Sequence, residues 1–95
     1  MPSYRVTMVI GALAAGVSPQ QVLPAAKAAA LELSVVEASD LAVVAGEARI
    51  TVRFAADETE IAQQIGRHVA SRTAALASVP RWQLTERVGG RWQVR

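Results

Sequence analysis

Residues 49–54 alternate strictly between polar and apolar side chains, in the order Arg-Ile-Thr-Val-Arg-Phe. Side chains on a β-strand point to opposite faces with a period of two, so this segment predicts a strand that is buried on one face only. The apolar set is Ile50, Val52 and Phe54, and the polar set is Arg49, Thr51 and Arg53. The outer face of this strand therefore carries two arginines. The function depends on whether they contact water, a carboxylate, a phosphate or another subunit.

The composition limits the classes of protein to consider. The 95 residues match the size of one domain, so we expect a single domain over residues 1–95. The chain has no cysteine, which excludes disulfides, thiolate metal sites and cysteine nucleophiles. The net charge is only +2, but residues 47–95 hold eight arginines against five acids. A genome rich in G and C would also enrich arginine and alanine, so this bias alone does not indicate nucleic-acid binding.

The N-terminal region has two interpretations. Arg5 and the largely apolar segment 6–16 loosely resemble a secretory signal. A strand is favoured, because the basic part is short and Thr7 and Gly11 interrupt the apolar run. No stretch approaches the ~18 consecutive apolar residues of a membrane span. We therefore expect a cytoplasmic protein that makes no membrane contact.

The first half of the chain predicts one strand and one helix. Residues 4–10 are rich in β-branched side chains and predict a strand. Ser18 followed by Pro19, with a glutamine two residues after the proline, is typical of a helix start. Pro24 removes a backbone hydrogen bond, so either the first turn is irregular or the regular helix starts at Pro24. The alanine-rich run up to Leu33 favours a helix in both cases.

Residues 35–44 and 48–55 predict two strands joined by a hairpin, with Gly46 and Glu47 at the centre of its turn. In this register apolar residues face apolar residues and an acid faces a base, which supports it. It pairs Val43 with Ile50 and Leu41 with Val52 on the buried face, and Val44 with Arg49, Ala42 with Thr51 and Asp40 with Arg53 on the other face.

The second half of the chain predicts a helix and two more strands. Asp57 and Glu60 form a capping pattern ahead of a helix over residues 58–76. The expected buried stripe of this helix consists of Ile61, Ala62, Ile65, Val69 and Leu76. A fourth strand follows over residues 82–88, with Trp82 in the core. The pair Gly89–Gly90 then turns the chain into a short fifth strand over residues 91–95.

The predicted order is β-α-β-β-α-β with one additional C-terminal strand. Two right-handed β-α-β crossovers joined by a hairpin give an antiparallel sheet with both helices on one face. This is the ferredoxin-like arrangement of the α+β class, with the first and third strands in the centre. The arrangement carries many unrelated functions, so it assigns none by itself.

The helices leave one sheet face open, and outward residues of three adjacent strands are expected to form a patch there. They are Arg5, Thr7 and Val9, then Arg49, Thr51 and Arg53, and then Gln83, Thr85 and Arg87. The last hairpin adds Trp92 opposite Arg87 and Val94 opposite Thr85, which predicts an Arg–Trp stack. The candidate interface or anion-binding residues are Arg5, Arg49, Thr51, Arg53, Arg87 and Trp92.

Three interpretations of this patch compete. It is a solvated face whose arginines are paired with Asp40, Glu37 or Glu86; or it is an assembly surface with Trp92, Val94, Val9 and Val44 as apolar anchors; or it binds single-stranded nucleic acid. The RNA-binding version of this fold needs aromatic residues on the two central strands. This chain has Thr7, Val9, Arg49 and Thr51 in those places. Assembly is therefore favoured over nucleic-acid binding.

Enzymatic interpretations have weaker support. His68 is the only histidine, and its helical position beside the expected stripe favours a structural role over general-base catalysis. The loop from Gly11 to Gly16 precedes a helix, which makes it a candidate ligand loop, but it lacks Walker-type residues. A small-ligand protein or a cofactor-independent enzyme of dimeric α+β type is the second alternative. We expect no metal site and no cofactor.

These observations together predict a non-enzymatic domain that self-associates or docks a protein partner through its open sheet face or its C-terminal hairpin. Nucleic-acid binding through the Arg/Thr face and Trp92 is the first alternative.

Overall fold

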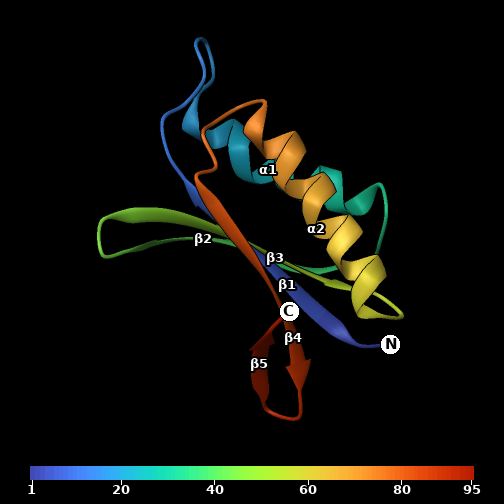
Figure 1. Ribbon diagram of the computed structural model, residues 1–95. Coiled ribbons are helices and arrows are strands. Elements are labelled where there is room, and N and C mark those ends of the chain that lie inside the picture. Colours follow the sequence, from blue (N-terminus) through green and yellow to red (C-terminus); the bar gives the residue numbers. More distant parts are fainter.

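The computed structural model describes residues 1–95 as a five-stranded antiparallel sheet with two helices packed against one face (Figure 1). The strands are β1 (Ser3–Ile10), β2 (Val36–Val44), β3 (Glu47–Ala55), β4 (Arg81–Val88) and β5 (Arg91–Val94). The helices are α1 (Val22–Leu31), preceded by the 3-10 turn η1 (Pro19–Gln21), and α2 (Thr59–Ala74). The predicted succession of strands and helices is thus confirmed, with boundaries that differ by a few residues.

The strand order across the sheet is β2-β3-β1-β4-β5. β1 lies in the middle, where Val6 has Val52 of β3 as its Cα partner on one side and Leu84 of β4 on the other. All pairings are antiparallel. The two outermost strands are β2 and β5, so each has one unpaired edge.

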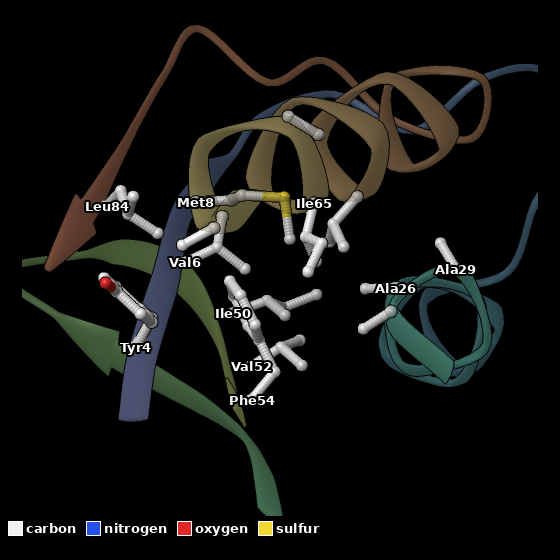
Figure 2. Packing of buried hydrophobic residues seen from close by; sticks show 14 of the residues in the cluster. Tyr4, Val6, Met8, Ala26, Ala29, Ile50, Val52, Phe54, Ile65 and Leu84 are labelled. Atoms are coloured by element: carbon white, nitrogen blue, oxygen red, sulfur yellow. The ribbon is translucent and has the colours of Figure 1, made fainter. Parts of the chain in front are cut away.

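A core of 17 buried apolar residues fills the space between the sheet and the helices. The alternation predicted for β3 is observed, because Ile50, Val52 and Phe54 are at most 1% exposed. Figure 2 shows these side chains facing Ala26 of α1 and Ile65 of α2. The buried side of α1 consists of one valine and three alanines, and such small side chains let a helix approach its neighbours closely.

The start of α1 resolves the alternatives left by Pro24. The first turn is irregular: it is the 3-10 turn η1, and the α-helix begins at Val22. The backbone N–H of Ser18 donates to the side-chain oxygen of Gln21 at 2.7 Å, which satisfies one of the unpaired donors at this terminus.

The indole of Trp82 on β4 packs directly against the backbone of α2 at Gly66. A Cβ atom built at Gly66 would lie only 3.0 Å from Cζ3 of Trp82, so a larger residue would clash with the indole. Ala62, Ile65 and Val69 of the predicted stripe of α2 are buried, which confirms its centre. The buried face also includes Gly66, Ala70 and Thr73, whereas Ile61 is 39% exposed. Trp82 packs half-buried against the core, on the inward side of β4 as predicted.

The β2–β3 hairpin corrects the predicted register by two residues. The turn is centred on Ala45 and Gly46, with φ angles of 52° and 79°, and not on Gly46 and Glu47. Two consecutive positive φ angles are the geometry of a type I′ turn, which matches the twist of its strands. The pairing therefore becomes Leu41 with Ile50, Val43 with Ala48, Ala42 with Arg49, Val44 with Glu47 and Asp40 with Thr51.

A shift of two residues keeps every side chain on its predicted face, but it does not bury the β2 side chains. Leu41 and Val43 lie on the helix side of the sheet and remain 51% and 73% exposed. The reason is visible in Figure 1, where the β2–β3 hairpin extends past the region that the helices cover. The expectation that Leu41 and Val43 are core residues is therefore wrong.

Candidate functional site

The sheet face opposite the helices, here called the open face, collects the outward residues of β1, β3 and β4. Arg5 has Arg53 and Thr85 as its Cα partners, Thr7 has Thr51 and Gln83, and Val9 has Arg49 and Arg81. The structure therefore brings the predicted patch together and adds Arg81 to it. The sequence did not single out Arg81 because it precedes the predicted start of the fourth strand.

Trp92 links the C-terminal hairpin to the centre of the sheet. The guanidinium carbon of Arg5 lies 3.9 Å from the centroid of the indole ring, and that of Arg53 lies 5.2 Å away. Both distances are within the range of cation–π attraction. Arg87 is the Cα partner of Trp92, as predicted, but the structure records no stack between them. The Arg–Trp stack thus forms with arginines of β1 and β3.

Glu37 anchors the β2 end of this cluster. Its Oε1 accepts hydrogen bonds from Ser3 Oγ at 2.7 Å and from Arg53 Nε at 3.0 Å. The hydrogen bond from Ser3, followed by that from Arg53 and the charges of Arg53 and Arg87, outweighs desolvation and lowers the pKa of Glu37. Glu37 is therefore an ionised partner that holds the Arg53 guanidinium near Trp92.

A second cluster lies at the opposite end of the open face. Glu47 Oε1 accepts from Arg81 Nη2 at 2.8 Å and from Arg49 Nη2 at 3.3 Å, so one carboxylate serves two arginines. The Nε–H of Arg49 is buried and has no acceptor. Between the two clusters Thr51 Oγ1 donates to Thr7 Oγ1 at 3.4 Å. On the outer side, the threonine contact thus joins β3 to β1, and the Glu47–Arg81 ion pair joins β3 to β4.

The charges of the open face are only partly balanced. Glu37 pairs with Arg53, and Glu47 pairs with Arg49 and Arg81. Arg5 and Arg87 have no carboxylate partner. Arg87 donates to the carbonyl oxygen of Gly89 at 3.3 Å, and Arg5 has the indole of Trp92 beside it. The face thus presents an aromatic ring beside Arg5, and neither Arg5 nor Arg87 forms a salt bridge.

Two shallow hollows mark the open face. One of about 160 Å³ is lined by Thr7, Val9, Arg49, Arg81, Trp82 and Gln83. The other, of about 250 Å³, is lined by Arg5, Ala38, Ser39, Asp40, Thr51 and Arg53. Both are smaller than the typical pocket of a drug-sized ligand.

His68 lies away from the open face, on α2. Its Nε2 contacts Glu32 Oε1 at 2.8 Å, and Arg72 Nη2 lies 3.6 Å from Glu32 Oε2. The hydrogen bond with His68, with the charges of Arg72 and His68, lowers the pKa of Glu32 against the effect of desolvation. These three residues connect the C-terminal end of α1 to α2, which is a structural role.

The candidate ligand loop between Gly11 and Gly16 uses two of its backbone amides in hydrogen bonds within the protein. Gly11 N–H donates to the carbonyl of Ser78 at 2.7 Å, and Ala14 N–H donates to that of Leu76 at 2.8 Å. The chain here extends β1 as a short ladder against residues 76–78, with a bridge between Leu13 and Ala77. These amides are engaged and do not point to an anion.

The outer edge of β2 is a feature that the sequence reasoning missed. Its last four residues, Leu41 to Val44, are uncharged and exposed, and their backbone has no neighbour beyond β3. The available signal was the run Leu-Ala-Val-Val, which lacks the polar alternation of a strand with one wet face.

Comparison with known proteins gives no relative. No protein-family model matches this chain, and no curated protein or solved structure is significantly similar to it. Neither helix has the length and apolar character needed to cross a lipid bilayer.

Proposed function

We propose that this domain is a non-enzymatic interaction module that self-associates or docks a protein partner through its open face and C-terminal hairpin. The observation that carries the proposal is the position of Trp92 beside Arg5 and Arg53. Tryptophan and arginine are the residues most enriched among those that dominate binding energy at interfaces. The exposed Val94, two residues after Trp92 on β5, extends the same surface with apolar area.

We further propose that the fold is the ferredoxin-like arrangement with one added strand. The strand order β2-β3-β1-β4, the antiparallel pairings and the position of both helices on one face support this assignment. The additional strand β5 matters for function because it brings Trp92 to the open face.

The test of the interaction surface is the substitution Trp92→Ala, compared with Gln93→Ala on the opposite side of β5. We expect Trp92→Ala to lower the mean mass measured by light scattering at concentrations where the wild type associates. Gln93→Ala should leave that mass unchanged, and circular dichroism should show that both variants are folded. Equal masses for the wild type and Trp92→Ala would contradict self-association through the open face.

Single-stranded nucleic acid is a second candidate partner, favoured by the same stack of Trp92 with two arginines. Against it, Glu37 and Glu47 already pair with three of the arginines on the face. Titration of a labelled oligonucleotide at about 50 mM and 200 mM salt separates the candidates, because phosphate contacts weaken steeply with salt. Absence of binding at the lower salt concentration would eliminate nucleic acid.

A further inference from the structure

We infer that two copies of this chain pair through the C-terminal half of β2, edge to edge, to form one continuous sheet. The proposal concerns a surface separate from the open face, and either contact can exist without the other. It starts from the exposed, uncharged segment Leu41–Val44 at the outer edge of the sheet. Unpaired strand edges of this kind are templates for pairing with another chain.

The two halves of β2 differ in their suitability for pairing. The first half contains an irregularity between Val36 and Ala38 and carries the charged Glu37 and Asp40. Bulges and charged side chains are devices that prevent edge pairing. The second half has neither, and it exposes Leu41, Val43 and Val44 at 51%, 73% and 44%. A partner strand is therefore confined to the second half.

Antiparallel pairing with a second copy places apolar side chains of this segment opposite each other, and the charge of Asp40 selects the register. Pairing centred on Asp40 would use the whole strand but would place two aspartates opposite each other, which is destabilising. Pairing centred on Ala42 avoids this, because Asp40 then faces Val44 of the second copy. It also places Leu41 opposite Val43 of the second copy, and Val43 opposite Leu41, on the helix side.

Geometry permits this arrangement. A two-fold axis perpendicular to the sheet keeps the helices of both copies on one side and the open faces on the other. The β2–β3 hairpin extends past the helices, so neither helix blocks the approach of a second strand (Figure 1). The ladder is short, which places the contact among the small, transient interfaces. Its consequence is a ten-stranded sheet, twice the five strands of one copy, with two open faces side by side.

The test is sedimentation velocity over roughly 10 µM to 1 mM, the range suited to a weak dimer. Val43→Lys introduces a charge at the centre of the proposed ladder. Val35→Lys is the matched control, because Val35 is 68% exposed but lies before β2 and outside the ladder. We expect the wild type and Val35→Lys to dimerise with rising concentration, and the dissociation constant of Val43→Lys to rise at least tenfold.

Two results would overturn the proposal: a wild type that stays monomeric over the whole range, or a Val43→Lys variant that dimerises like Val35→Lys. Trp92→Ala separates this contact from the open face, since it should leave the β2 dimer intact. If Trp92→Ala abolishes association and Val43→Lys does not, the open face is the contact and the β2 pairing is wrong.

Discussion

The two edges of this sheet are built differently. β5 has four residues, is preceded by Gly89–Gly90, and has arginines at position 91 and immediately after its end at position 95. Arg95 Nε lies 2.8 Å from Glu86 Oε1, which fastens the end of the strand to β4. β2 has nine residues, and its last four are uncharged and exposed. Short, charged edges resist pairing with other chains, and long uncharged edges invite it.

This contrast indicates which edge of the sheet is able to pair with another chain. β5 is short and flanked by arginines, and the first half of β2 carries charged side chains and an irregularity. No such protective feature follows Asp40 in β2. An unprotected edge carries a risk of aggregation, so its retention in a folded domain points to a use. The comparison thus separates two surfaces: an edge that pairs copies, and an open face that presents Trp92.

The largest expected effect comes from a substitution in the packing between the sheet and helix α2, on which both edge strands depend. Trp82 of β4 packs against Gly66 of α2 and holds this side of the sheet to the helix layer. We expect Trp82→Ala to lower the free energy of unfolding by about 3 kcal/mol through loss of packing, measured by urea denaturation. A loss below about 1 kcal/mol would mean that β4 is not held by α2 and that the two edges do not share one rigid core.

The next largest effect is the loss of stability when a turn glycine of either hairpin is replaced by alanine. Gly46 has φ of 79° and Gly89 has φ of 61°, so an alanine at either position is strained. We expect Gly46→Ala to destabilise the fold by about 1 kcal/mol or more, because its hairpin includes β3, which is paired on both sides in the sheet. Gly89→Ala should lower the melting temperature less, because β5 is short and lies at the edge.

Gly90→Ala is the matched control for the turns, since Gly90 has no positive φ and no atom within 4 Å of a built Cβ. It should leave the melting temperature unchanged. A larger loss for Gly89→Ala than for Gly46→Ala would reverse the assigned importance of the two hairpins.

The smallest effect concerns the protected half of β2. Ser3 makes the largest contribution to the lowered pKa of Glu37. Ser3→Ala should therefore raise the pKa of Glu37, measured by titrating its carboxyl carbon by NMR. Because folding lowers this pKa, the stabilising contribution of Glu37 is present above the ordinary carboxyl range and is lost as pH falls through the lowered value. An unchanged pKa in Ser3→Ala, with Ser39→Ala as the control, would contradict this assignment.

The alternation of polar and apolar residues made most of the sheet predictable. The period of two along Arg49–Phe54 assigns each side chain to a face, and the structure places every one of them on that face. The Gly89–Gly90 turn signal likewise located Val94 opposite Thr85 and Trp92 opposite Arg87. Local patterns of this kind depend on neighbouring residues only, so they are visible in the sequence.

Other features depended on geometry that the sequence does not encode locally. The hairpin register follows from positive φ at Ala45, and an alanine gives no signal for that conformation. The contact of Trp92 with Arg5 and Arg53 crosses strands that are distant in the chain. The exposure of Leu41 and Val43 depends on how far the helices extend over the sheet, which periodicity does not reveal.

The most direct test of the account is amide hydrogen exchange of β2 at low and high protein concentration. Alternate amides of an edge strand point away from its single neighbour and exchange freely until a second strand pairs with them. We predict that the outward amides within residues 40–44 become protected as the concentration rises, while those of β5 stay unchanged. Protection that is independent of concentration, or that increases along β5 instead, would contradict the pairing of two copies through β2.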